Sequence, residues 1–145
     1  MGAKILISIL VVISIYLVPM TYAQYMYSGT ASVRPAPYAD RSCPDETISD
    51  LNNTCVAIAG DAVWEGPQTC GTKYFINCTG STIQGLPCPC TGKSVVVTIV
   101  EHCLTSVTCS VNGNFNTFQL SQEAFLEIAD PTYPNIAIEY KRVYY

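Results

Sequence analysis

The sequence predicts an all-β fold, a small barrel of about six strands with one or two short helices. After residue 27 the apolar residues follow the period of strands rather than the period of long helices. Clusters of Gly, Pro and Asn separate these runs, as turns do. All eight cysteines follow an apolar N-terminal segment. Disulfides can therefore stabilise a domain whose core is small.

Five segments are expected to form strands, and in chain order they are Gly29–Val33, Lys73–Cys78, Ser94–Val100, Asn116–Leu120 and Ile136–Val143. The third reads SVVVTIV and is apolar on both faces, which favours a central position. The last reads IAIEYKRV and alternates cleanly between apolar and polar residues.

One stretch has the pattern of a helix. Ser121 can cap its N-terminus, Glu123 falls in its first turn, and Pro131 prevents its continuation. Its apolar face would consist of Ala124, Phe125 and Ile128. A second, shorter helical turn is expected between Val56 and Trp64.

The first 23 residues have the pattern of a secretory signal peptide. Lys4 provides the positive charge, Ile5–Val18 is an apolar run, and Pro19–Ala23 ends in small residues suited to cleavage. The run is too short for a membrane span, which needs about 20 apolar residues. We therefore expect a secreted, extracellular protein that starts at Gln24 and does not insert into a membrane. Such a compartment is oxidising, and an even number of cysteines there indicates disulfides.

The charge of the chain argues against nucleic acid as a partner. The net charge is −4, and one unit more negative once Lys4 is removed, whereas nucleic-acid binding requires a basic face. Asn52 and Asn77 each begin an Asn-x-Thr triplet and are candidate N-glycosylation sites. Asn52 is the better candidate, because Asn77 precedes a cysteine.

Several tracts together resemble one family. They are GTASVRPAPY, AIAGDAVW, CGTKYFINCTGSTIQG, PCTGKSVVVTIVEHC and LSQEAFLEIADPTYPNIAIEYKRV. They are similar to the plant natriuretic peptide-like proteins, whose expansin-like domain is related to family 45 endoglucanases and barwin. The resemblance spans about Gly29 to Val143. It implies a single double-psi β-barrel domain over residues 24–145, apoplastic in a plant, without the second carbohydrate-binding domain of expansins.

The resemblance also implies a set of disulfides. Carried over by position, it implies the bridges Cys43–Cys70, Cys78–Cys90 and Cys103–Cys109. Cys55 and Cys88 stand where relatives usually lack cysteine, and we expect a fourth bridge between them. The sequence Cys88-Pro89-Cys90 leaves open whether Cys78 pairs with Cys88 or Cys90. A metal site built from Cys88, Cys90, Cys103, Cys109 and His102 is the rival interpretation, but the spacing does not favour it.

The resemblance places a groove residue at Gln119, where hydrolase relatives carry an aspartate before Leu-Ser. An amide is neither a general acid nor a general base near neutral pH, and glycoside hydrolysis normally uses two carboxyl groups. Glu101 stands where relatives carry another aspartate. Trp64 and Tyr74 are candidate stacking residues for sugar rings, although Trp64 fits the core better. We therefore predict no catalytic site, no metal and no cofactor.

Two functions remain from these observations. The first is a non-enzymatic extracellular signalling protein of the natriuretic peptide-like type, which affects water and solute balance through a cell-surface receptor. Its active stretch would correspond to about Pro37 to Tyr74. The alternative is a non-catalytic, barwin-like protein that binds cell-wall polysaccharide or acts in defence. In either case we expect a monomer.

Overall fold

The computed structural model describes residues 25–34, 42–47, 49–50, 52–103, 110–111 and 114–145, together with Gly2 and Lys4. Apart from these two residues, the predicted signal peptide lies outside this part of the chain, as do Cys109 and residues 37–41. Among the described residues, no helix combines the length and apolar character needed to cross a bilayer.

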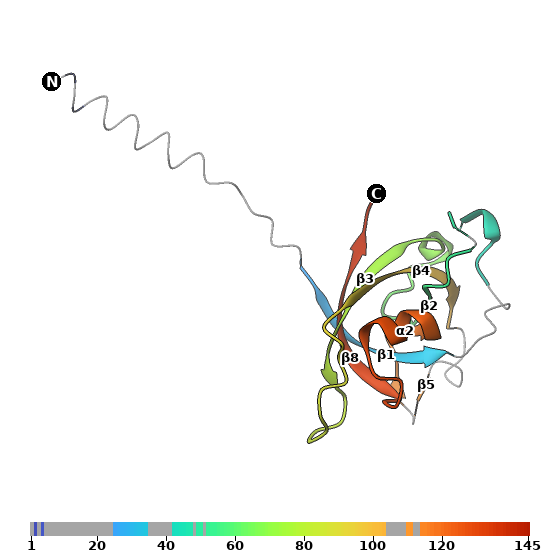
Figure 1. The fold of residues 1–145 in the computed structure, drawn as a ribbon. Coiled ribbons are helices and arrows are strands. Elements are labelled where there is room, and N and C mark those ends of the chain that lie inside the picture. The colour runs from blue at the N-terminus through green and yellow to red at the C-terminus, as the bar shows by residue number, and fades with distance from the viewer. Residues whose placement is uncertain are drawn as a thin grey trace.

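Six strands close into a barrel (Figure 1). They are β1 (Tyr27–Arg34), β2 (Val56–Ala59), β3 (Lys73–Ser81), β4 (Ser94–His102), β7 (Phe118–Ser121) and β8 (Asn135–Val143). Their order around the barrel is β1-β7-β2-β4-β3-β8. The pairs β1/β7 and β2/β4 are parallel, and the other neighbouring strands are antiparallel. The expected six-stranded barrel is confirmed.

The shorter elements lie in the connections. The 3₁₀ helices η1 (Asp45–Thr47) and η2 (Pro67–Thr69) flank β2 along the chain, and β5 (Ser110–Val111) pairs with β6 (Asn114–Phe115) in a two-stranded ribbon. The α-helix α2 (Gln122–Ile128) follows β7 and packs against β4, β7 and β1 (Figure 1).

The core follows from the two-residue alternation along the strands. Alternate residues of β3 and β4 point inward, and Ile76, Val97 and Ile99 are completely buried. Phe118 and Leu120 of β7 join them, and the ring of Phe118 meets that of Tyr140 edge-on, with centroids 5.0 Å apart. The outer face of β4 is also covered, since Thr98 and Val100 are buried. This explains why the whole segment SVVVTIV is apolar or β-branched.

The helical turn expected between Val56 and Trp64 is wrong for its first half. Val56–Ala59 is strand β2, whose four residues are all buried because β7 and β4 flank it and both its faces are covered. Only Gly60–Trp64 turns: the N–H groups of Val63 and Trp64 both donate to the carbonyl of Gly60 at 3.0 Å.

The predicted cap of α2 is confirmed. The hydroxyl of Ser121 accepts a hydrogen bond from the backbone N–H of Ala124 at 3.3 Å, as an N-cap does. The same hydroxyl accepts from the N–H of Val56 at 3.2 Å. Ser121 therefore fixes the start of the helix to strand β2.

Two of the implied disulfides are present, Cys43–Cys70 and Cys78–Cys90. The first attaches the segment before β2 to the start of β3, and the second joins β3 to the approach to β4. Cys103 is also disulfide-bonded. Its implied partner Cys109 lies outside the described residues.

The fourth bridge is wrong, since Cys55 and Cys88 are both free thiols. Val56, the neighbour of Cys55, is bonded to Ser121 at the N-terminus of α2. Pro89, the neighbour of Cys88, accepts from the N–H of Asp130 beyond the other end of the helix. A helix of this length holds its ends about 10 Å apart. A disulfide requires Cα atoms within about 7 Å.

Candidate functional site

A row of register positions across four neighbouring strands carries three polar side chains, Ser32, Gln119 and Glu101, of which Ser32 is completely buried. In the strand register, Gln119 of β7 lies beside Ser32 of β1 and Ile58 of β2, and Ile58 lies beside Glu101 of β4. Arg34, Glu101 and Gln119 line one small hollow with the apolar Val56 and Ile58. Two of the predicted groove residues, Glu101 and Gln119, are therefore brought to one hollow from strands that are separated in the barrel by β2.

The carboxylate in this row, that of Glu101, forms an ion pair with Arg34. The Arg34 Nη1 atom lies 2.5 Å from the Glu101 Oε2 atom, and the two side chains are 25% and 24% exposed. The hollow beside them has a volume of only about 10 Å³, the room for one water molecule. A hollow of this size does not admit a six-membered ring.

Gln119 contributes an amide to the same hollow and is half-buried. An amide donates and accepts hydrogen bonds without a charge. Glu101 is the only carboxylate that lines the hollow among the described residues. The arrangement therefore offers hydrogen-bonding groups, but no pair of carboxyl groups on either side of a substrate bond.

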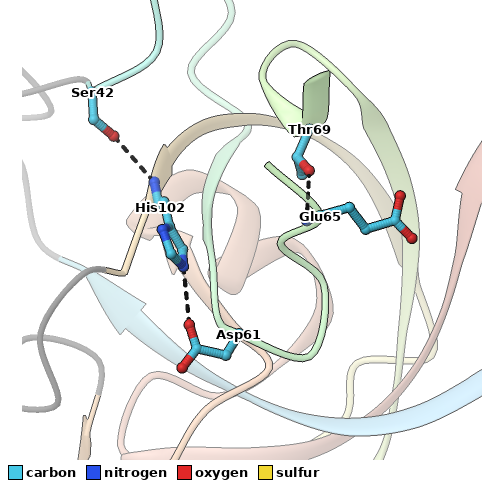
Figure 2. A network of polar contacts seen from close by, with 5 residues as sticks. All are labelled: Ser42, Asp61, Glu65, Thr69 and His102. Carbon is cyan, nitrogen blue, oxygen red and sulfur yellow. Dashed lines mark hydrogen bonds and ion pairs between the residues drawn. The ribbon is translucent and has the colours of Figure 1, made fainter. Parts of the chain in front are cut away.

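An aromatic stack lies at the next position along β4. The rings of Trp64 and His102 are parallel to within 2°, with centroids 4.4 Å apart. Figure 2 shows the His102 ring directed at the carboxylate of Asp61. The Nε2 atom lies 3.0 Å from the Asp61 Oδ1 atom, and the backbone N–H of His102 donates to the hydroxyl of Ser42 at 3.1 Å. A carboxylate only accepts, so Nε2 carries the proton in this contact. His102 has a structural role here, since it holds Trp64 and the Asp61 turn against β4.

The loop after Trp64 is fixed by its own hydrogen bonds. The N–H of Glu65 donates to the hydroxyl of Thr69 at 2.9 Å, which leaves the Glu65 carboxylate pointing away from His102 (Figure 2). Gly66 has a φ of 120°, a conformation that glycine adopts without strain. These contacts fix the direction in which Trp64 and Glu65 leave the turn.

Trp64 and Tyr74 do not share one groove. Trp64 is half-buried and packs against Val56 and Val100 as well as the main core, so it is partly a core residue, as the sequence favoured. Tyr74 is buried inside the barrel, where its ring lies 5.4 Å from Phe118. Its outer end lines a different hollow, together with Tyr140.

The sequence reasoning missed Arg34 and Asp61. Neither residue belongs to a recognisable sequence motif. Each meets its partner only because the fold of the barrel brings distant segments together. Of the two candidate glycosylation sites, Asn52 is exposed and Asn77 is half-buried in β3. Glycosylation at both remains a prediction.

Comparison with known proteins identifies the family. A family model described as "Lytic transglycolase" matches residues 56–140. An EG45-like domain containing protein of Citrus jambhiri is 34% identical over 134 residues, which is 92% of this chain and 95% of that protein. The chain belongs to the EG45-like domain family. A second EG45-like relative, the putative EG45-like domain containing protein 1 of Arabidopsis thaliana, is 40% identical over 85 residues, or 59% of this chain and 63% of the relative.

Solved structures show the same fold as this EG45-like chain. The apo expansin of Clavibacter michiganensis superimposes with a TM-score of 0.57 at 17% identity, over 83% of this chain and 51% of the expansin. A mutant of that expansin in complex with cellohexaose gives a TM-score of 0.53. The EG45-like chain thus spans about half the length of the expansin. Its expansin-like, double-psi barrel domain is confirmed.

Proposed function

We propose that this EG45-like chain is a secreted, non-enzymatic protein that binds a neutral cell-wall polysaccharide. One observation carries the proposal: Gln119 and an Arg34-bound Glu101 line the same small hollow on the outer face. The groups in this row can hold hydroxyl groups by hydrogen bonds, whereas they cannot supply an acid and a base together.

The description of the matching family names a lytic reaction, and the residues of this chain argue against it. Cleavage of a glycosidic bond normally uses one carboxylic acid and one carboxylate on opposite sides of the bond. Here Gln119 replaces one of them, and the other, Glu101, has an oxygen occupied by Arg34. A substrate would have to displace Arg34 before it could reach that oxygen.

Three features support binding outside the cell. The expansin of similar fold was obtained in complex with cellohexaose, a neutral glucan fragment. Residues 1–23 have the pattern of a signal peptide, and disulfides such as Cys43–Cys70 persist in oxidising compartments. The acidic net charge of −4 disfavours anionic partners at long range. The proposed location is therefore the apoplast, with the protein acting as a monomer.

The test is a sedimentation assay on insoluble cellulose, combined with a measurement of released reducing sugar. We expect the mature protein to sediment with cellulose and to release no sugar. Gln119→Asp restores the missing carboxyl group, and a gain of hydrolysis in this variant alone would support the account of the site. Sugar release by the natural protein would overturn the non-enzymatic proposal.

The segment that the Cys43–Cys70 disulfide closes favours signalling as a second candidate function. Cys43 is bridged to Cys70, and its N–H donates to the carbonyl of Val100 at 3.1 Å, so the Pro37–Tyr74 stretch is tied to the barrel near both of its ends and can present one surface. A receptor could recognise such a surface. Swelling of wall-free protoplasts in response to the oxidised protein would support signalling, because no wall polysaccharide remains to be bound.

A further inference from the structure

A second hollow lies where β1 begins and β8 ends, away from the polar row of the outer face. Its volume is about 350 Å³, and four tyrosines line it, Tyr27, Tyr74, Tyr140 and Tyr144. Small-molecule sites in proteins occupy about 300–1,000 Å³ and are mostly lined by apolar and aromatic groups with a few polar ones. This hollow, which we call the tyrosine hollow, falls at the small end of that range.

The four rings divide into a fixed floor and an accessible wall. Tyr74 and Tyr140 are each only 8% exposed, and their ring centroids lie 6.2 Å apart. Tyr27 and Tyr144 are 61% and 77% exposed. Tyr27 is oriented by Tyr140, with centroids 5.7 Å apart, and Tyr144 by the guanidinium of Arg142, 5.1 Å from its ring. Each exposed ring therefore has one neighbouring side chain of the hollow against it.

Two opposite charges complete the lining, Arg142 and Glu65. Both act on the Tyr74 hydroxyl: burial raises the pKa of Tyr74, Arg142 lowers it and Glu65 raises it. Arg142 and Glu65 form no ion pair with each other among the described contacts. The guanidinium offers several donors and the carboxylate several acceptors, and the two charges cancel. A neutral ligand with many hydroxyl groups fits this balance better than an anion or a cation.

We propose that the tyrosine hollow binds a pyranose ring of a neutral glycan, with Tyr27 and Tyr144 against its apolar faces and Arg142 and Glu65 on its hydroxyl groups. The inference rests on the proposed polysaccharide binding and assigns it a contact point separate from Glu101 and Gln119. A long glycan would then be held at two places on the barrel.

The test compares exposed tyrosines inside and outside the hollow. Tyr27→Ala and Tyr144→Ala remove its wall, whereas Tyr25→Ala and Tyr145→Ala remove tyrosines that are 84% and 94% exposed and do not line it. All four side chains are exposed, so the variants should fold, which thermal unfolding verifies. Calorimetry with cellohexaose should give at least about a fivefold loss of affinity for the first pair, as for a truncated aromatic anchor, and no change for the second.

The outcomes separate this inference from the proposed function. If the natural protein binds cellohexaose and the two pairs of variants bind equally well, the tyrosine hollow is not a site and the proposed function stands. A loss of affinity in Gln119→Ala but not in Tyr144→Ala would lead to the same conclusion. If the natural protein binds no neutral glycan at all, both proposals are wrong. Trp64 is the only tryptophan and does not line the hollow, so tyrosine ring resonances should shift on binding by more than those of Trp64.

Discussion

The side chains of Arg34 and Glu101 meet at 2.5 Å, although strands β7 and β2 lie between the strands that carry them. The contact crosses the outer face of half the barrel and passes beside Gln119. The contact occupies one oxygen of Glu101, which is the only carboxylate that lines the hollow among the described residues. The hollow therefore lacks a second carboxyl group opposite Glu101 among the residues that line it.

Removal of either partner of this pair should lower the free energy of unfolding by about 1–2 kcal/mol, between the values for exposed and buried ion pairs. Arg34→Met and Glu101→Gln should each show this loss in urea unfolding. The double variant should lose less than the sum, because the second change has no pair left to break. Glu46→Gln, at an exposed residue of η1, is the control and should change little. Additive losses would show that the two side chains do not interact in solution.

The two free cysteines should differ in reactivity. Burial, with the nearby carboxylates of Glu127 and Glu123, raises the pKa of the Cys55 thiol, while Cys88 is exposed. Because the thiolate is the reactive form, iodoacetamide at neutral pH should modify Cys88 first and Cys55 slowly. Peptide mapping by mass spectrometry measures both rates. A Cys55–Cys88 disulfide in protein purified without reductant, with neither thiol modified, would contradict the structure.

Gly60 should not tolerate a side chain. Its N–H donates to the carbonyl of Thr117 at 2.9 Å, and a Cβ atom would collide with the backbone oxygen of Asn116. Gly60→Ala should cost about 1–3 kcal/mol of stability, as overpacking does. Gly80→Ala is the matched control, because nothing lies within 4 Å of its Cβ position. Equal unfolding midpoints for the two variants would mean that β2 and the strand that follows Thr117 are packed less closely than described.

The tyrosines of the hollow should make stability depend on alkaline pH. Burial is the main cause that raises the pKa of Tyr74 and of Tyr140 above the ordinary value. Below about pH 10 tyrosine is neutral in the unfolded chain as well, and the burial of these two rings contributes fully to the free energy of unfolding. This contribution is lost as the pH rises through the pKa of the folded state. Urea unfolding across this range should show the loss, and Tyr74→Phe should reduce it. A stability that rises with pH in this range would contradict the account.

Local patterns in the sequence predicted much of the fold. Ser121 caps α2 as expected because an N-cap depends only on its neighbours. The segment 94–100 is rich in β-branched residues on both faces, which predicts a strand with a neighbour on each side. In the structure it pairs with β2 and with β3. The four residues Val56–Ala59, by contrast, are too few to distinguish a buried strand from a helical turn by period.

Contacts between distant segments could not be predicted. The pairing of Arg34 with Glu101 depends on the order of the strands in the barrel, and the separation of Cys55 from Cys88 depends on the position of α2. The tyrosine hollow combines Tyr27 with Tyr140 and Tyr144, residues more than a hundred positions apart. The sequence supplied Gln119 and Glu101 as groove residues only through a family resemblance, and the register then brought them together.

The measurement that tests the central claim most directly is calorimetric titration of the oxidised protein with cellohexaose, with chromatography of the same sample afterwards. The account predicts saturable heat of binding and intact cellohexaose. Shorter fragments in the chromatogram, or no heat at any concentration, would contradict it.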